Sequence, residues 1–264
     1  VINMDKRPIG MFDSGVGGLT VLKEVINSNP NEDIIYLGDT KRFPYGSKSK
    51  ESIIELTKNG IDFLISKNVK AIIIACGTAT SQALEEMKKI YRIPIIGIID
   101  PTVKYIKEKE SLRNIGIIAT SGTIRSKGWQ TNILKQIPKA KIKNKACPLL
   151  APMAEEGWTD NEIAKLTIKE YLKDVKDVDC LVLGCTHYPL FKKIIVEELG
   201  ENVEIINTGE MVSKDLKEIL ASSDMQNDVN NHGNYKIYLT DTETNFINVA
   251  SKLLENENIK VNEC

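Results

Sequence analysis

The sequence predicts an α/β protein in which two similar parallel-sheet units face each other about a pseudo-twofold axis, with the active site in the cleft between them. Two observations predict this architecture. Short runs rich in Ile and Val alternate with amphipathic stretches of helical period, which is typical of βαβ units and parallel sheets. Three of these runs also recur, in the same order, about 110 residues later in the chain.

Nine stretches, most of them apolar, have the length and the flanking turn residues of strands. They are Pro8–Phe12, Ile34–Gly38, Ala71–Ala75, Ile95–Ile99, Ile115–Ala119, Ala140–Cys147, Cys180–Gly184, Val203–Asn207 and Tyr235–Leu239. A helix is expected after Thr244, and the polar stretch Ser222–Asn234 is expected to form an exposed loop.

The repeat is clearest around two cysteines. The apolar run that leads into Cys76 matches the run that leads into Cys185, 109 residues further along the chain. The strands that begin near Ile9 and Ile115 also match, at an offset of 106 to 107, and each is followed by a Ser-Gly pair. The pair Ile95-Ile96 recurs after 110 residues. Three matches in one order indicate two copies of one α/β unit.

The repeat sets the expected domains. Residues 1–97 together with 208–264 are assigned to a first α/β domain, and residues 98–207 to a second. Sites in α/β proteins lie beyond the carboxyl ends of the strands. Cys76 and Cys185 both stand at such ends, so two units that face each other would bring them to one cleft from opposite sides.

The composition excludes several kinds of protein. Of the 264 residues, 42% are hydrophobic and 27% are charged, as in an ordinary globular chain. The 35 basic and 36 acidic side chains include no long basic run, which argues against nucleic-acid binding. No apolar run approaches the roughly 20 residues of a membrane helix, and the start, Val1–Arg7, lacks the apolar core of a secretory signal. We expect a cytoplasmic protein with no nucleic-acid or membrane partner.

Five widely spaced cysteines argue against a disulfide framework, because their number is odd and the chain is large enough to fold without one. Cys147, Cys180 and Cys264 are interpreted as packing residues. A single cysteine beside a strand is also most often a buried apolar residue. Cys76 and Cys185, however, occupy equivalent positions of the repeat, and the helix expected after Cys76 favours a thiolate at its amino end. These two are therefore candidates for chemistry.

Two thiols on opposite sides of a cleft suit one reaction class. A racemase removes a proton from one face of a carbon and delivers another to the opposite face. An ordinary thiol, with a pKa of about 8.5, is mostly protonated at neutral pH, so nearby donors must favour the thiolate on the basic side. Asp13 and His187 are candidates for assisting proton transfer, and Thr78 and Thr186 for holding a substrate's charged groups. This chemistry needs no metal or cofactor.

Two turns are candidates for binding an anion. The glycines of Asp13–Gly18, after the first strand, allow positive φ and a close approach of the backbone to a ligand. Thr20 replaces the third glycine of the dinucleotide fingerprint, which disfavours a nicotinamide site. Asp13 also suits a plain turn residue or helix cap. In Pro44-Tyr45-Gly46, by default a turn, the glycine would let backbone amides meet a carboxylate.

Several motifs in one order resemble the glutamate racemases of the aspartate/glutamate racemase family. The resemblance runs from about Pro8 to Gly209. The motifs are Asp13-Ser14-Gly15-Val16-Gly17-Gly18-Leu19-Thr20, Gly38-Asp39-Thr40 with Pro44-Tyr45-Gly46, Ala75-Cys76, and Gly184-Cys185-Thr186-His187-Tyr188-Pro189-Leu190.

The resemblance implies the fold of that family, conversion between L- and D-glutamate without a cofactor, and supply of D-glutamate for peptidoglycan. It implies that Cys76 deprotonates the D-enantiomer and Cys185 the L-enantiomer, with Asp13 and His187 assisting. Glu155 matches a supporting acidic position, although a solvated carboxylate at a helix start fits equally. The residues that match substrate-binding positions are Asp13, Ser14, Pro44, Tyr45, Gly46, Gly77, Thr78, Thr123, Thr186 and His187. Homodimers occur in the family, so a homodimer is a possible assembly.

One position departs from the family pattern. The family usually carries asparagine after the first cysteine, whereas this chain has Gly77. The missing side-chain donor would cost on the order of 1.5 to 3 kcal/mol of binding, unless a water or another amide replaces it. A racemase for aspartate or a related acid therefore stays open.

Two other classes stay open as well. A zinc hydrolase would use Cys76, Cys185, His187 and Asp13 as ligands if these converge, although the Cys185-Thr186-His187 spacing is unfavourable for it. A non-catalytic protein on the same duplicated scaffold would bind an amino acid without exchanging its α-proton.

Overall fold

The computed structural model describes residues 4–228, 230, 232–242, 245–255 and 259–264, and its strands form two parallel sheets. The first sheet has the order β10-β9-β2-β1-β3-β4 and consists of β1 (Ile9–Asp13), β2 (Ile34–Gly38), β3 (Ala71–Ile74), β4 (Ile95–Gly97), β9 (Tyr235–Leu239) and β10 (Val261–Glu263). The second has the order β6-β5-β7-β8 and consists of β5 (Asn114–Ala119), β6 (Lys141–Ala146), β7 (Cys180–Leu183) and β8 (Glu204–Asn207).

The second sheet repeats the topology of four strands of the first. The order β6-β5-β7-β8 corresponds to β2-β1-β3-β4 when β5 is matched with β1. The register agrees, since Ile9 pairs with Ala71 and Ile115 pairs with Cys180, the residues at the repeat's offsets. The predicted pair of similar parallel-sheet units is confirmed. The strands of the first sheet all lie within residues 1–97 and 208–264, and those of the second lie within 98–207. This division supports the domain boundaries expected above, which we retain as a proposal.

All nine predicted strands are present; β2 and β9 have the predicted bounds, and the other seven have ends shifted by one or two residues. The largest shift is at β4, which stops at Gly97, whereas the sequence predicted a strand to Ile99. Helix α4 begins at Ile99, and Pro101 sits in its first turn, where a missing N–H costs nothing. Strand β10 was not predicted, because three residues of mixed polarity give no periodic signal.

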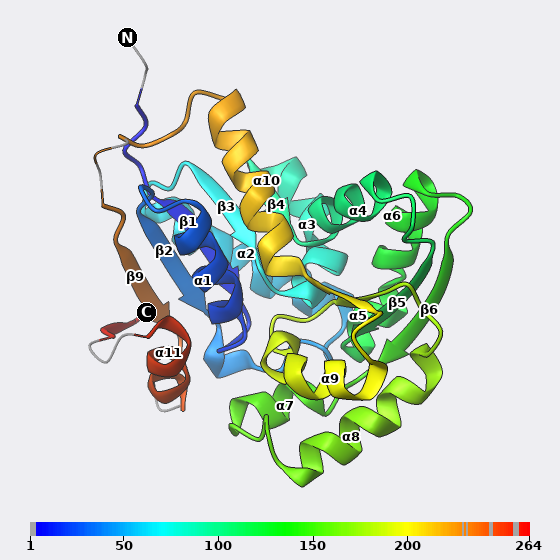
Figure 1. Cartoon of the computed structure of the whole chain (residues 1–264). Helices are drawn as coiled ribbons and strands as arrows, with labels where there is room; N and C mark the ends of the chain where they lie inside the picture. Colours follow the sequence, from blue (N-terminus) through cyan, green and yellow to red (C-terminus); the bar gives the residue numbers. More distant parts are fainter. Residues whose placement is uncertain (1–3, 229, 231, 243–244, 256–258) are drawn as a thin grey trace.

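Helices cover both faces of each sheet (Figure 1). They are α1 (Gly18–Ser28), α2 (Lys50–Ser66), α3 (Gly77–Ile90), α4 (Ile99–Glu108), α5 (Ser121–Ser126), α6 (Gly128–Gln136), α7 (Leu150–Glu155), α8 (Glu162–Leu172), α9 (Lys192–Leu199), α10 (Thr208–Ser222) and α11 (Phe246–Leu254), with 3₁₀ turns η1 (Thr40–Arg42), η2 (Lys173–Val175) and η3 (Tyr188–Phe191). Helices α1 and α10 pack on one face of the first sheet, and α2 and α3 on the other. Helices α7, α8 and α9 lie together beside the second sheet (Figure 1).

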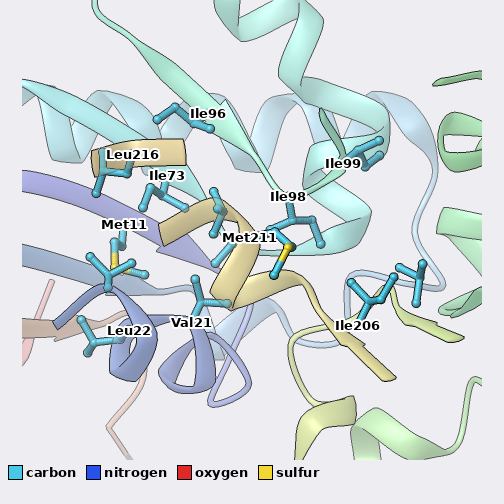
Figure 2. Close-up of a cluster of buried hydrophobic side chains, with 14 of the residues drawn as sticks. Met11, Val21, Leu22, Ile73, Ile96, Ile98, Ile99, Ile206, Met211 and Leu216 are labelled. Carbon is cyan, nitrogen blue, oxygen red and sulfur yellow. The ribbon is translucent and has the colours of Figure 1, made fainter. Parts of the chain in front are cut away.

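One hydrophobic cluster joins the two units. Strand residues alternate between faces, so Met11 and Ile73 point toward α1 and α10, while Phe12 points toward α2. Figure 2 shows this cluster continuing through Met211 of α10 to Ile206 of β8 in the second sheet. The shared packing positions the ends of the strands of both sheets relative to each other.

The remaining expectations concern the chain ends and one loop. The described part of Ser222–Asn234 is irregular after its first residue and mostly exposed, while positions 229 and 231 lie outside the described residues. Residues 1–3 at the chain's start and Thr244 also lie outside the described residues. The helix expected after Thr244 is α11. None of the helices within the described residues is both long and apolar enough to cross a bilayer.

Candidate active site

Cys76 and Cys185 follow equivalent strands and line the same cavity of about 260 Å³. Cys76 comes two residues after β3 and immediately before α3, and Cys185 comes two residues after β7. Both are almost completely buried. Burial raises the pKa of the Cys76 thiol to about 12, and the charge of Asp13 adds to the effect, while hydrogen bonds from the Ala79 amide and the Ser14 hydroxyl act in the opposite direction. Cys76 is therefore a neutral thiol in the free protein.

Gly77 is a point of close approach between the two cysteine-bearing segments. A Cβ atom at this position would lie 2.1 Å from the carbonyl oxygen of Gly184. That oxygen belongs to the backbone just before Cys185, so it cannot rotate away as a side chain would. The absence of a side chain at position 77 thus has a steric reason, in addition to the loss of an amide donor that the sequence indicated.

Asp13, at the end of β1, is completely buried and lies behind the cavity wall rather than in it. Its Oδ2 accepts hydrogen bonds from the amides of Gly15 and Gly18, at 3.0 and 2.9 Å, and its Oδ1 accepts one from Thr186 Oγ1 at 3.2 Å. Burial raises the pKa of Asp13 to about 6, against the opposing effects of His187 and of the two amides. Asp13 therefore changes charge close to neutral pH.

Replacing Asp13 with asparagine is expected to stabilise the protein at pH 8. The Asp13 carboxyl titrates near pH 3.8 in the unfolded chain and near pH 6 in the folded protein. Burying it therefore costs no folding free energy below the lower pKa, and the whole penalty is present above the higher pKa. The difference corresponds to about 3 kcal/mol. The asparagine oxygen can accept from the amides of Gly15 and Gly18, and its NH2 group can donate to the Thr186 hydroxyl, which then becomes the acceptor. Urea unfolding of Asp13→Asn should show a gain at pH 8 that shrinks as the pH falls toward 4. Equal stability at pH 8 would contradict the buried charge.

The glycine-rich turn differs from the expectation. Its described glycines do not have positive φ, and its amides are used internally, since Val16 N donates to Glu155 Oε1 at 2.9 Å. Gly17 instead allows close packing, because a Cβ there would lie 2.5 Å from His187 Nδ1. The turn therefore binds the protein's own carboxylates and supports the histidine.

Cys185, His187 and Glu155 form a hydrogen-bonded chain. His187 Nδ1 lies 3.6 Å from Cys185 Sγ, and Nε2 lies 2.6 Å from Glu155 Oε1. Burial by itself lowers the pKa of His187, but hydrogen bonds to Cys185 and Glu155 and their charges outweigh it and hold that pKa well above its ordinary value. Glu155 ends α7, with its side chain about one-fifth exposed, so the alternative of a solvated carboxylate at a helix start is wrong. A protonated His187 can donate to both neighbours.

A cluster of hydroxyls forms another part of the site. Thr78 Oγ1 lies 2.8 Å from Thr120 Oγ1 and 3.3 Å from Thr123 Oγ1. Thr78 and Thr120 line the cavity, whereas Thr123 lies behind them. Thr186 also lines the cavity, and its carbonyl accepts a hydrogen bond from Thr20 Oγ1.

The turn at Pro44-Tyr45-Gly46 forms the side of the cavity that spans both units. Tyr45 is buried and donates its hydroxyl to Asp39 Oδ2 at 2.6 Å, which holds the turn against the first sheet. The amide of Gly122, in α5, donates to the carbonyl of Gly46 at 2.8 Å. The turn is therefore fixed from both sides.

Most of the residues predicted from the sequence meet in this cavity. Those that line it are Ser14, Pro44, Tyr45, Gly46, Cys76, Gly77, Thr78, Cys185, Thr186 and His187. Asp13, Thr123 and Glu155 lie behind the wall. Lining residues that the sequence did not suggest include Phe43, Ser47, Thr120, Ser121, Arg125, Pro148, Ala151 and Pro152. Thr120, Ser121 and Arg125 lie within three residues of Thr123, whose predicted role was the one available signal for them.

The cavity gives the zinc alternative no support. Among the described residues, no group of three or more His, Cys, Asp or Glu side chains is arranged to hold a metal ion. Both ring nitrogens of His187 already face Cys185 and Glu155.

Comparison with known proteins agrees with this arrangement. The family model described as Asp/Glu/Hydantoin racemase matches residues 20–214. A glutamate racemase from Geobacter metallireducens is 42% identical over 253 residues, which cover 95% of this chain and 94% of the relative.

Solved structures show the same similarity over almost the whole chain. The glutamate racemase of Francisella tularensis in complex with D-glutamate has a TM-score of 0.90 and 38% identity, covering 98% of each chain. The RacE1 isoform from Bacillus anthracis has a TM-score of 0.93 and 34% identity, covering 98% of this chain and 97% of its own. With these matches and the duplicated fold around two cysteines, the chain belongs to the aspartate/glutamate racemase family.

Proposed function

We propose that this protein interconverts L- and D-glutamate by moving protons at the α-carbon between Cys76 and Cys185. The observation that carries the proposal is the position of two buried cysteines at equivalent strand ends of a duplicated fold, in one small cavity. The similarity to glutamate racemases over nearly the whole chain supports glutamate as the substrate.

The surroundings of the two cysteines differ. Cys76 is a neutral thiol and therefore a proton donor. Cys185 faces His187, whose raised pKa favours the imidazolium, so the ring can donate a hydrogen bond to the Cys185 sulfur. Cys185 is proposed as the base for L-glutamate, which is the direction that the family resemblance implies.

The reaction balances without a further reactant. The Cα–H bond of L-glutamate breaks and its proton moves to the Cys185 sulfur, while the electron pair stays on the α-carbon. That carbon then takes the proton of the Cys76 thiol on its opposite face, and D-glutamate results. Cys76 is left as a thiolate, to which the Ser14 hydroxyl and the Ala79 amide can donate. The enzyme is then ready for the D-enantiomer, and no cofactor is needed.

Polar groups of the wall are placed to hold the substrate. The hydroxyls of Thr78 and Thr186, next to the two cysteines, are candidates for its α-carboxylate and ammonium. The Tyr45–Gly46 turn presents backbone to the same cavity and suits a carboxylate. Because the α-carbon has to lie between two sulfurs, these contacts must be accurate as well as favourable.

The cellular role follows from the proposed product. D-glutamate would be supplied to peptidoglycan synthesis, in the cytoplasm. The five free cysteines are consistent with a reducing compartment. Homodimerisation stays a prediction, which sedimentation analysis checks.

The experiment that tests the function is proton NMR in deuterated water with separate L- and D-glutamate and L- and D-aspartate. Deuterium entering the α-position of glutamate together with loss of optical rotation, in the presence of a chelator, is the expected result. Faster turnover of aspartate would support the alternative that Gly77 left open. Loss of activity in the chelator would support the zinc hydrolase, and binding without exchange would support a non-catalytic protein.

Replacing Glu155 with glutamine is expected to move the alkaline limb of the pH profile of kcat/KM to lower pH. Glutamine lacks the charge that helps to keep His187 protonated, so the pKa of His187 should fall. At pH 8.5 kcat/KM should then be lower than in the unchanged protein, while the two should agree at lower pH. Glu156→Gln, which changes an exposed neighbour, is the matched control. An unchanged limb in Glu155→Gln would remove His187 from the proton transfers.

A further inference from the structure

The catalytic cavity has a buried floor and an exposed rim. Cys76, Cys185 and His187 are each less than one-tenth exposed and form the floor. The exposed lining residues are Pro44, Ser47, Arg125, Pro148 and Pro152, which come from three separate segments. A substrate that reacts between the two sulfurs therefore has one end deep in the cavity and the other toward this rim.

Arg125 is the one lysine or arginine among the residues that line the cavity. It belongs to α5, whose N-cap Thr120 is part of the threonine cluster of the wall. Within the part of the chain that the structure describes, its guanidinium takes part in no ion pair or side-chain hydrogen bond. Its charge is thus available to a ligand.

The surroundings of Arg125 are positive on the outer side as well. Arg125 also lines a neighbouring pocket that contains Lys48 and Lys50 and has no carboxylate in its wall. Three cations in a wall that contains no carboxylate make this side of the rim attractive to an anion. The protein has almost no net charge, so the effect is local.

The proposed substrate has a matching distribution of charge. Its α-carboxylate and ammonium are bonded to the reacting carbon, so they must stay at the floor with the two sulfurs. The side-chain carboxylate is the group farthest from that carbon and reaches furthest toward the rim. Aspartate is shorter by one methylene, so its carboxylate stops short of the same position.

We propose that Arg125 binds the side-chain carboxylate of the substrate and selects glutamate over aspartate. This role rests on the proposed glutamate racemisation and adds a determinant of specificity to it. An arginine can hold a carboxylate through two parallel hydrogen bonds, which adds directional preference to charge attraction. Because Arg125 is exposed, we expect it to contribute less to binding affinity than a buried charged contact would. We also expect added salt to weaken that contribution.

The test compares Arg125→Gln, Arg125→Lys and the unchanged protein by α-proton exchange. KM for L- and D-glutamate should rise about tenfold in Arg125→Gln, while kcat stays within twofold of its original value. The KM of Arg125→Lys should lie between those of the unchanged protein and Arg125→Gln. The inhibition constant of L-aspartate, measured against glutamate exchange, should change less than twofold. Arg92→Gln, which removes an exposed arginine outside the cavity, should leave all of these constants unchanged.

Two results would overturn the proposal. One is an unchanged KM for glutamate in Arg125→Gln. The other is an equal loss of affinity for glutamate and aspartate, which would mean that Arg125 acts on a group common to both acids. Failure of the proposed function would look different, because the unchanged protein would then not exchange the α-proton of glutamate at all.

Discussion

Racemisation of glutamate should fall at least about a thousandfold when either Cys76 or Cys185 is replaced with alanine. Each thiol is the only acid or base proposed for its face of the α-carbon, and general acid–base groups contribute about 10² to 10⁴ in rate. The two enantiomers have equal free energy, so kcat/KM must fall equally in both directions. Polarimetry on each variant measures this loss.

The remaining proton exchange should depend on the enantiomer. Cys76→Ala keeps the base for L-glutamate, so any residual deuterium should enter the L-form with retention of configuration. Cys185→Ala should show the opposite preference. Cys180→Ala is the matched control, because Cys180 is a buried thiol on β7 outside the cavity. Residual exchange of the same enantiomer in both variants would contradict the assignment of one cysteine to each face.

A side chain at position 77 should lower kcat/KM about a hundredfold. The Cβ of Gly77→Ala would lie 2.1 Å from the backbone oxygen of Gly184, and Cβ atoms essentially never approach other atoms within 3.0 Å. The segments that carry Cys76 and Cys185 would have to move apart by about 1 Å, and a displacement of that size can cost about a hundredfold in rate. Exchange kinetics, normalised to the folded fraction from circular dichroism, measure the effect.

Gly77→Asn separates two explanations of this glycine. If the missing side-chain amide is what matters, asparagine should improve glutamate binding. If the close approach to Gly184 is what matters, asparagine should be at least as harmful as alanine. We expect the second result, because a donor cannot offset a backbone collision. A gain in activity for Gly77→Asn would show that the segments separate easily.

Much of the fold and of the cavity was predictable because both follow from local patterns. Apolar runs of strand length, separated by amphipathic stretches, indicate parallel strands through burial alone, and all nine predicted strands were found. The repeat placed Cys76 and Cys185 at equivalent strand ends, and sheet geometry puts such ends at one edge. Strand β4 was predicted two residues too long, because isoleucines continue the apolar pattern into the start of α4.

The sequence by itself determined the α/β class and the duplication, since both depend on residue type and spacing along the chain, and the family resemblance of its motifs implied most of the cavity-lining residues. Only the tertiary structure decided which groups meet across long separations. Glu155 contacts His187 and the Val16 amide, Gly184 fills the space beside Gly77, and Arg125 reaches the rim from α5. The physical reason is that these contacts depend on how the two units pack against each other, and side-chain packing across a shared core leaves no periodic trace in either partner's sequence.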